Sequence, residues 1–543
     1  MKKLLKKYAW HPARGLLASL IAAASIAITA VATPANAEPV LQSAPWSGPL
    51  YLWVMDNGVG SQKAVHKLVK KFRRDTGIPV EVRVLNWANA YAAISEALAN
   101  PDSVADFPDV LQLGSTWVPH FASTGKLRVL DTLLAQIDSS RFYPELFKAS
   151  RMVGSPDVYS FPWFLDVRVF FANEWLWHSL DIQDSDISDF SRFLGSLRAI
   201  NRGELKNSEM KRVAAFALPG KDDWTGPQQM APFVWSYGGE FLDCEEGSCR
   251  SGLLDSLTLA GISVFVKILG DNELAPLSLS ENSAQNAARF VNSEVLIHYG
   301  SSELVRQLDY PEDVGGLRSS AIADDGIMIL PSPEGPRAHY TFVGGSHLAL
   351  PKHGDSVRYA AAEMLLSYLL RSDNIDGFCR AVGFLPSDRG LISIWNQDRR
   401  YSQVIQSLEI GKSFPNIPEW GEIECILNKL TNDIGPALSL NENEDIRGRE
   451  VAKLLVQAHK DVNKVLRRDD SLDEAAALKM VENALLADIP EVLPDDLKFE
   501  HPTSLYPMWR VVDIIIVVAF VLISLVVIAA FVCLIVCLVR RKK

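Results

Sequence analysis

The sequence predicts an α/β fold of two or more lobes, followed by one C-terminal transmembrane helix. Three observations support this prediction. Strand and helix patterns alternate over residues 50–126, the segment between the two chain ends is too long for one compact core, and residues 514–539 carry no charge. Crossover helices between successive strands are typical of a parallel sheet, and chains beyond about 250–300 residues divide into separate cores.

The alternation starts with the apolar run PLYLWVM, which stops at Asp56. Apolar residues at helical spacing follow until Gly77, and IPVEVRVLNW then alternates as a strand does. ANAYAAISEALANP is helical again, FPDVLQLGS is the third strand, and TWVPHFASTGKL returns to helix. This order predicts three parallel strands joined by crossover helices.

Polar and aromatic residues follow each of these strands. Open parallel sheets bind ligands outside the carboxyl ends of their strands. The residues just past the three ends are Asp56, Asn57, Asn86, Trp87, Ser115, Thr116 and Trp117. Indole rings suit the apolar faces of a pyranose, and amides and carboxylates suit its hydroxyls. These residues therefore predict a sugar-type site, with packing of Trp87 and Trp117 on their own helices as the alternative.

The C-terminal run predicts a membrane span. As a helix, residues 514–539 would extend roughly 39 Å, more than the ~30 Å hydrocarbon core of a bilayer. Trp509 stands at the entry, and residues 540–543 are all basic. We therefore expect a transmembrane helix at 509–539 with the tail 540–543 in the cytoplasm, rather than a buried core helix.

The N-terminus carries the complementary signal. Five basic residues precede an apolar run, and the small residues Ala35 and Ala37 offer a cleavage site. Residues 1–37 are therefore predicted to be a secretory signal peptide, with an uncleaved first span as the alternative. In both cases residues 38–510 lie outside the inner membrane, beginning with a linker at 38–48.

Charge and motif content exclude several function classes. The chain carries −11, of which residues 1–37 contribute +5 and residues 511–543 contribute +3, which leaves −19 on residues 38–510. A field of that sign disfavours nucleic acid and anionic lipid as partners. No G-x-S-x-G, H-E-x-x-H or G-x-G-x-x-G motif is present. We expect no catalytic residues, no metal site and no cofactor.

Four cysteines belong to the predicted external domain. Cys244 and Cys249 flank a short polar loop, which in an oxidising compartment predicts a local disulfide. Cys379 and Cys425 remain and are candidates for a second pair. Sequence alone allows three pairings of the four.

Residues 440–486 are helical and charged, with one apolar stripe that includes Val451, Leu455 and Val462. Docking on a lobe is the favoured use of the stripe, and a partner helix is the alternative. Residues 487–508 contain four prolines, which exclude a regular helix and predict a semi-stiff stalk.

Several segments occur in the order found in one known family. They are KLVKKFRRDTGIPVEVRV, FPDVLQLGSTWVPHFASTGKLRVLDTLL, SFPWFLDVRVFFANEWLW, DDWTGPQQMAPFVWSYGGEFLD, AARFVNSEVLIHYGSSEL and GIMILPSPEGPRAHYTFVGGSHLAL. In this order they resemble extracellular solute-binding proteins of the maltose-binding type, family 1. The resemblance runs from about Pro49 to about Leu466.

The resemblance implies a two-lobed periplasmic-binding-protein fold of type II-like topology that closes on a ligand. The bilobal domain would occupy residues 49–486. Lobe 1 would take about 49–157 and 345–400, and lobe 2 about 158–344 and 401–486. The chain would cross between the lobes near 155–159 and 342–350, and again around residue 400.

The resemblance also implies further site residues. Asp166 falls where the family places an acidic acceptor for sugar hydroxyls, although an ion pair with Arg168 is the alternative. Aromatic ledges would come from Trp163, Trp224, Tyr237 (or Trp235) and Trp420, unless these rings pack in the core or hinge. Ser301 and Gly345 would bring backbone close to the ligand. This chain shows Ser301-Ser302 where many members place an aromatic, which affects the expected ligand size.

Together these features predict a membrane-tethered solute-binding protein in the periplasm. It would capture a carbohydrate or similar polar solute and deliver it to ABC permease subunits, and tethering would raise its local concentration there. One alternative is a sensor that presents the same domain to a membrane signalling partner. The least favoured alternative is an envelope polysaccharide-degrading enzyme.

Overall fold

The structure is a computed structural model that describes residues 46–152, 154–180, 182–245, 248–440, 443–468 and 471–494. The predicted signal peptide at 1–37, the predicted span at 509–539 and the basic tail lie outside these ranges. Across the ranges that are described, none of the helices combines the length and the apolar character needed to cross a membrane.

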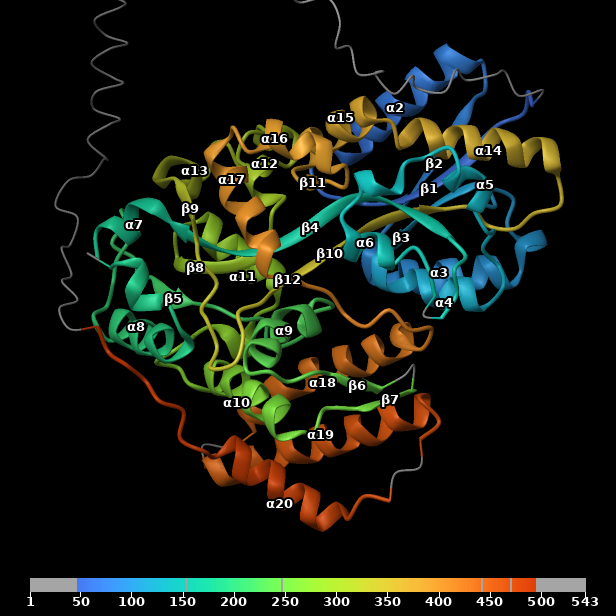
Figure 1. The fold of residues 1–543 in the computed structure, drawn as a ribbon. Coiled ribbons are helices and arrows are strands. Elements are labelled where there is room, and N and C mark those ends of the chain that lie inside the picture. The colour runs from blue at the N-terminus through green and yellow to red at the C-terminus, as the bar shows by residue number, and fades with distance from the viewer. Residues whose placement is uncertain are drawn as a thin grey trace, which may run out of the picture. The chain divides into compact units, whose positions relative to one another are not determined.

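The first lobe is built as the strand and helix patterns predict. Its elements up to Ser123 are β1 (Leu50–Met55), α2 (Ser61–Thr76), β2 (Val80–Leu85), α3 (Trp87–Ala99), β3 (Val110–Gly114) and α4 (Val118–Ser123). β1 lies between β2 and β3 and is parallel to both. The predicted parallel sheet with crossover helices is therefore confirmed, and Figure 1 shows it at the right of the molecule.

Two long strands continue this sheet from one lobe into the other. β10 (Thr341–Ala349) pairs antiparallel with β3 and with the first half of β4 (Ser160–Asn173). The second half of β4 pairs with β8 (Val295–Ser301) and β9 (Ile327–Leu330). The strand order is thus β2-β1-β3-β10-β4-β8-β5. The chain passes between the lobes inside β4, beyond the boundary near residue 157 that the resemblance implied.

The second lobe surrounds β5 (Ala214–Phe216), which is parallel to β8. Its helices before the hinge are α7 (Glu174–His178), α8 (Phe190–Arg202), α9 (Gly226–Ser236), α10 (Ser256–Gly270) and α11 (Ser283–Val291). One hydrophobic core unites α7, α8, α9 and α10, including Phe193, Trp235 and Phe265, whereas Trp53, Leu113 and Phe121 belong to a separate core in lobe 1. Two cores are the physical basis of two lobes.

The remaining short elements complete lobe 1 and cover the hinge. They are α5 (Asp131–Leu134), α6 (Pro144–Lys148), α12 (Leu304–Gln307), α13 (Ala321–Asp325), α14 (Ser356–Leu369), α15 (Ser372–Val382), β11 (Leu385–Pro386), α16 (Ile392–Trp395), α17 (Arg399–Gln406) and β12 (Gly411–Lys412). β12 pairs with the start of β10, so the chain reaches β10 a second time on its way to the C-terminal helices.

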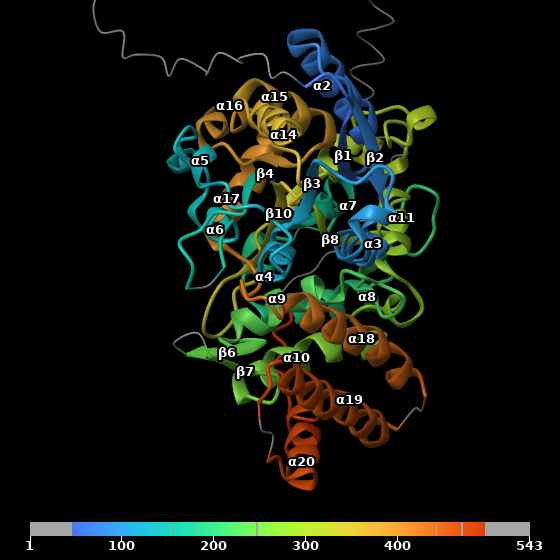
Figure 2. The same ribbon diagram turned by 90° about the vertical axis from the view of Figure 1, so that its right-hand side faces the viewer.

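Three C-terminal helices pack on lobe 2 (Figures 1 and 2). They are α18 (Trp420–Ser439), α19 (Glu444–Val465) and α20 (Glu474–Leu485). The stripe residues Val451, Leu455 and Val462 belong to the lobe-2 core. Docking of this region on the second lobe is therefore confirmed.

The predicted stalk begins on the surface of lobe 2. Residues 487–494, which we call the strap, run along α8 and α10 of that lobe. The Ile489 carbonyl accepts from Lys267, and the Val492 amide donates to the Ser191 carbonyl at 2.9 Å. The first third of the predicted stalk is therefore held against the domain, and the rest lies outside the described residues.

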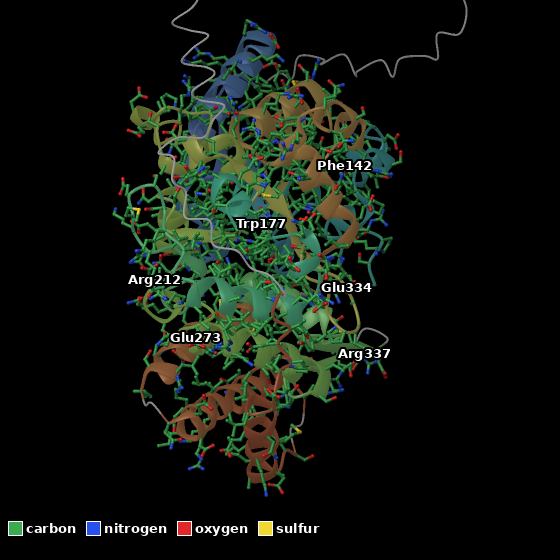
Figure 3. All side chains as sticks on the ribbon, turned by 90° about the vertical axis from the view of Figure 1, so that its left-hand side faces the viewer. Phe142, Trp177, Arg212, Glu273, Glu334 and Arg337 are labelled. Carbon is green, nitrogen blue, oxygen red and sulfur yellow. A yellow bond between two sulfur atoms is a disulfide. The ribbon has the colours of Figure 1, made fainter. Side chains whose placement is uncertain are left out.

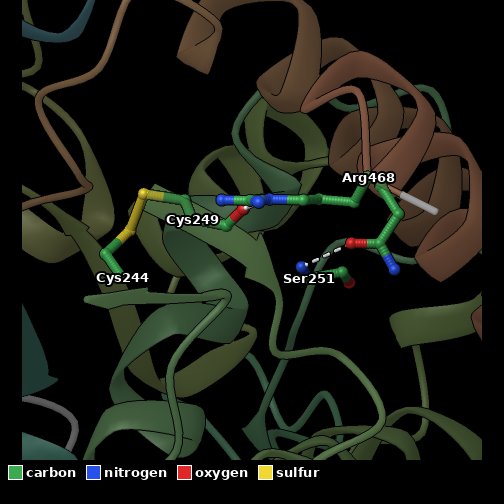
Figure 4. The surroundings of a disulfide bond; sticks show 5 residues. Cys244, Cys249, Ser251 and Arg468 are labelled. Carbon is green, nitrogen blue, oxygen red and sulfur yellow. Dashed lines mark hydrogen bonds between the residues drawn. A yellow bond between two sulfur atoms is a disulfide. The ribbon is translucent and has the colours of Figure 1, made fainter. Parts of the chain in front are cut away.

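One of the two expected disulfides is present. Cys244 and Cys249 are bonded across the hairpin of β6 (Leu242–Glu245) and β7 (Ser248–Ser251), and Arg468 after α19 donates to the Cys249 carbonyl (Figure 4). The predicted second disulfide, between Cys379 and Cys425, is not formed. Cys379 is buried in α15 on lobe 1, whereas Cys425 is exposed on α18 of lobe 2, and both are free thiols.

Candidate functional site

A cleft of about 1790 Å³ lies between the lobes. On the lobe-1 side it is bounded by the residues that follow β1, β2 and β3, as the parallel sheet requires. Nine of the twelve sequence-predicted ligand residues line it: Asp56, Asn57, Trp87, Ser115, Trp117, Asp166, Trp224, Ser301 and Gly345. Trp163, Tyr237 and Trp420 do not.

The lobe-1 rim of the cleft is aromatic. Asn86 caps α3 by accepting from the Ala88 amide, which sets Trp87 at the first helical position. The Trp87 and Tyr91 rings each meet Trp117 edge-on with centroids 5.4 Å apart. Trp87 and Trp117 thus pack against each other and also line the cleft, and their contact with a ligand stays a prediction.

Lobe 2 contributes Trp224, from the loop before α9. Its ring is parallel to that of Trp87 within 5°, with centroids 6.2 Å apart. Trp224 is 46% exposed, which is unusual for an indole in a folded domain. Two flat apolar faces from opposite lobes are therefore available to one ligand.

One face of α18 forms the lobe-2 rim opposite Trp117. Gly421, Glu424 and Asn428 line the cleft at helical spacing. Trp420 lies on the other face, fully buried and stacked on Phe414 with centroids 4.7 Å apart. The expectation that Trp420 enters the cleft is therefore wrong. The apolar pattern Trp420, Ile423, Leu427 could have shown which face points inward, and so could have identified Glu424.

Glu424 connects the lobes. Its Oε2 accepts a hydrogen bond of 3.2 Å from the indole Nε1 of Trp117. Burial raises the pKa of Glu424 to about 7, and the hydrogen bond from Trp117 opposes that rise. The site therefore holds a carboxylate that titrates near neutral pH.

The hinge strand β4 supplies the base of the cleft. Phe164, Asp166 and Arg168 alternate along the strand and face the cleft together. Asp166 Oδ1 accepts from Ser301 Oγ at 2.7 Å, and its Oδ2 lies 4.0 Å from Arg168 Nη2. Asp166 thus lines the cleft and takes part in the ion pair that one alternative expected, and its role as an acceptor for sugar hydroxyls stays a prediction.

Sequence reasoning missed Glu303, which follows β8. Its carboxylate lies against the turn after β1, since a Cβ on Gly58 would be 2.5 Å from Glu303 Oε2. Burial, with a further contribution from the charge of Asp166, raises the pKa of Glu303 to about 8, although Arg168 acts in the opposite sense. No spacing or motif in the sequence marks this residue.

Two predicted contacts are already used by the fold. The Asn57 side-chain amide is buried and exchanges two hydrogen bonds of 3.1 Å with the Gln112 amide, leaving little capacity for a ligand. Gly345 lies where a Cβ would be 2.4 Å from the Phe164 carbonyl oxygen. The close pairing of β10 with β4 thus requires a glycine at position 345.

The remaining two predictions are wrong for packing reasons. Trp163 is fully buried and stacks on Phe378 of α15 with centroids 4.2 Å apart. Tyr237 follows α9 and packs on the lobe-2 core beside Phe190. Both rings serve the interior of their own lobe.

The arrangement suits the binding of a solute. Aromatic faces, hydroxyls and carboxylates surround a large cavity. Within the described part of the chain, no group of three or more His, Cys, Asp or Glu side chains is placed to hold a metal ion.

Residues 67–392 match the family model described as bacterial extracellular solute-binding protein. The chain belongs to this family. Membership confirms that this is a solute-binding protein, because the family consists of solute-binding proteins rather than enzymes. The family is described as extracellular, which also supports a location outside the cytoplasm.

Individual relatives are more distant. The diacetylchitobiose-binding protein DasA of Streptomyces coelicolor is 25% identical over 376 residues, which cover 69% of this chain and 81% of DasA. The structure of maltose-bound MalE3 from T. maritima is similar with a TM-score of 0.62 at 16% identity, covering 77% of this chain and 99% of that one. The structure of an ABC transporter solute-binding protein from Agrobacterium radiobacter K84 in complex with ribitol is similar with a TM-score of 0.63 at 16% identity. The match covers 78% of this chain and 100% of that one. The two structures confirm the two-lobed periplasmic-binding-protein fold.

Proposed function

We propose that this protein captures a carbohydrate or similar polar solute by closing its lobes, and delivers it to the permease subunits of an ABC importer. The observation that carries the proposal is the pairing of Trp87 with Trp224 across the cleft, 6.2 Å apart and within 5° of parallel. Sugar rings have apolar faces that such indoles cover. Carboxylates and hydroxyls around the pair supply partners for the sugar hydroxyls.

The relatives support a sugar or polyol as the solute. Their names give diacetylchitobiose for the Streptomyces relative, maltose for the T. maritima protein and ribitol for the Agrobacterium protein. These ligands share several hydroxyl groups and differ in size. The cavity of about 1790 Å³ is large enough for a monosaccharide or an oligosaccharide.

The membrane tether is part of the same proposal. A span at residues 509–539 would keep the domain beside its permease and raise its effective concentration there. The domain would lie in the periplasm, and the tail at 540–543 would face the cytoplasm.

Thermal unfolding of residues 38–505 with a panel of sugars, oligosaccharides and polyols tests the binding proposal. A solute present at 100 times its Kd stabilises the native state by about 2.7 kcal/mol, which corresponds to an increase in Tm of a few degrees. Trp224→Ala should remove most of that increase and leave the Tm without ligand nearly unchanged, because the ring is half exposed. Met210→Ala is the matched control, since Met210 is an exposed apolar residue away from the cleft.

Two outcomes would contradict the proposal. One is a panel in which no solute raises the Tm. The other is a ligand-induced increase that Trp224→Ala and Trp87→Ala both leave intact, since binding would then occur elsewhere.

A further inference from the structure

Four charged side chains meet at the base of the cleft, and we call them the charged floor: Asp56, Asp166, Arg168 and Glu303. Three different segments contribute them. Asp56 follows β1, Asp166 and Arg168 stand two apart on β4, and Glu303 follows β8. The sheet order brings the last two segments together, because Arg168 pairs directly with Ser301 on β8.

The carboxylates of the floor exceed its positive charge. Asp56 has a weak contact of 3.4 Å from the Ser61 hydroxyl. Asp166 accepts from the Ser301 hydroxyl and lies 4.0 Å from Arg168, beyond hydrogen-bond distance. Glu303 has no hydrogen bond to its carboxylate from any described residue. Three acidic groups thus share one guanidinium.

The other arginines around the cleft are engaged outside the floor. Arg306 pairs with Asp309, Arg399 with Glu174 and Arg400 with Asp398, at 2.9, 3.3 and 3.2 Å respectively, and Arg318 donates to the Asp309 carbonyl. Lys63 projects from the first turn of α2 and, like Asp56, is exposed to solvent, where water screens both charges. Within the floor, three carboxyl groups thus face a single guanidinium.

Arg168 gives an independent sign that a ligand belongs here. The residue is only 6% exposed, and its guanidinium makes no hydrogen bond to any described residue, with Nε fully enclosed. A buried polar group without a partner costs free energy. Because Arg168 also lines the cleft, an acceptor oxygen on the bound solute can reach the Nη atoms of the guanidinium, whereas the enclosed Nε stays out of reach.

We propose that the charged floor selects a solute with a protonated amine beside hydroxyl groups, namely an amino sugar, over a neutral sugar of the same shape. The ammonium would lie between Asp56 and Glu303, and a neighbouring hydroxyl oxygen would accept from Arg168. A neutral sugar leaves the carboxyl groups of the floor without a second cation, whereas an ammonium forms charge-assisted hydrogen bonds with them. This inference rests on the proposed function, because it names the class of sugar that the cleft takes.

The inference has a thermodynamic signature. Burial keeps Glu303 largely protonated at neutral pH, and an ammonium beside it favours the ionised form. Binding of the amino sugar at pH 7 therefore releases protons from Glu303. Asp56, Asp166 and Arg168 are the charged groups that face this carboxyl and set how far its titration moves. Calorimetry in buffers of different ionisation enthalpy measures such release directly.

Three β-1,4-linked disaccharides form a matched series for the test: chitobiose with free amines, its diacetylated form, and cellobiose. They differ in the group at C2 alone. We add glucosamine with glucose and galactosamine with galactose, so that the test does not depend on one linkage. Calorimetry should show at least about tenfold tighter binding for the amine in a pair that binds, as expected for a charge-assisted hydrogen bond.

Glu303→Gln is the deciding variant because it keeps the shape and removes the carboxyl group that can ionise beside an ammonium. It should reduce the preference for the amine to less than about threefold and abolish the proton release, while the neutral sugar binds as before. Glu209→Gln is the control, since Glu209 is an exposed acid whose partner is Lys211 on the surface. Asp56→Asn repeats the test on the other side of the proposed ammonium.

Every outcome of these binding measurements either supports or contradicts the inference. Equal binding of amine and neutral partners would overturn the inference and leave the proposed function intact. Failure of every sugar in the series and in the wider panel would overturn both. A preference for the amine that survives in Glu303→Gln and in Asp56→Asn would show that the floor is not its origin.

Discussion

Trp117 of lobe 1 donates its indole N–H to the Glu424 carboxylate of lobe 2, with 3.2 Å between Nε1 and Oε2. The contact is supported one turn away, where the Tyr91 hydroxyl lies so close to Gly421 that a Cβ there would be 2.4 Å from it. The α18 rim thus contacts lobe 1 at two neighbouring places.

Trp117→Phe should loosen this contact. The variant keeps an aromatic ring and removes the donor to Glu424, so the bond's contribution of about 1 kcal/mol is lost, roughly a fivefold change in the ratio of open to closed forms. Cys425 reports the change, because among the described cysteines it is the exposed free thiol. Maleimide labelling of Cys425 without ligand should be faster in the variant.

The control for this measurement is Trp224→Phe, which changes an indole that makes no hydrogen bond to a described residue. Cys425→Ser sets the background from other thiols. Equal labelling rates in Trp117→Phe and in the unmodified protein would mean that the Trp117–Glu424 bond does not hold the lobes together.

Gly421→Ala should open the α18 rim. The new methyl group would overlap the Tyr91 hydroxyl and ring, with distances of 2.4 to 2.9 Å, so α18 or Tyr91 has to move. Alanine is a better helix former than glycine by about 1 kcal/mol, so α18 itself should not weaken. We expect faster Cys425 labelling and weaker solute binding. The double variant Gly421→Ala with Tyr91→Ala should recover the slow rate, and failure to recover it would rule out this overlap as the cause.

Much of the fold could be predicted because its patterns are local. The strand before Asp56 was indicated by a continuous apolar run, and the helix that ends at Gly77 by its periodicity and a C-terminal glycine, and both occur as expected. The passage of β4 through both lobes is different. Its 14 residues are buried almost throughout, and such a run does not reveal where its partners change from β10 to β8.

The site could be predicted where it follows from topology. Asp56, Trp87 and Trp117 line the cleft because parallel strands end on one edge. Trp163 and Trp420 failed because an aromatic residue near the cleft in sequence can point to either face of its element. Glu303 was missed because its position depends on how the segment after β8 folds back on the turn at Gly58, a long-range contact without a sequence pattern.

The two carboxyls with raised pKa values predict a loss of stability with rising pH. Glu303 and Glu424 have pKa values of about 8 and about 7, above the ordinary 4.5. Between pH 4.5 and 8 the folded state therefore binds more protons than the unfolded state, so the free energy of unfolding falls as pH rises, by at most about 1.4 kcal/mol per unit and group. Glu303→Gln should raise Tm at pH 8 and change it little at pH 4.5.

Glu209→Gln, an exposed surface change, should show no such dependence on pH and serves as the control for the thermal scans. If Glu303→Gln lowered Tm at pH 8, the ionised carboxylate would be stabilised by its surroundings rather than penalised by burial. We expect Glu303→Gln to be more stable at pH 8 and to bind the proposed amino sugar less well, because residues at ligand sites are often not optimal for stability.

Residues 487–494 precede the predicted membrane span in the sequence and lie against lobe 2. Arg198 of α8 contacts Glu491 of the strap through Nη2 at 2.8 Å, and it also pairs with Asp271 at 2.7 Å. Glu273 takes part in the same network and lies on lobe 2 in Figure 3. Hydrogen bonding from Arg198 lowers the pKa of Glu491 to about 2.

Loss of this network should free the strap without unfolding the lobe. A depressed carboxyl pKa stabilises the fold above its ordinary 4.5, and that stability disappears as pH falls from 4.5 towards 2. Arg198→Ala should remove it at neutral pH, by ~2 kcal/mol, and hydrogen exchange of the Val492 amide should become fast. Arg202→Ala is the matched control, because Arg202 is more exposed and contacts Glu273 but not Glu491.

Gly195→Ala gives an independent check, since its Cβ would lie 2.0 Å from the Val492 carbonyl oxygen. The substitution favours helix formation in α8, so a fall in Val492 protection would arise from displacement of the strap, whereas unchanged protection in both variants would show that neither contact holds it.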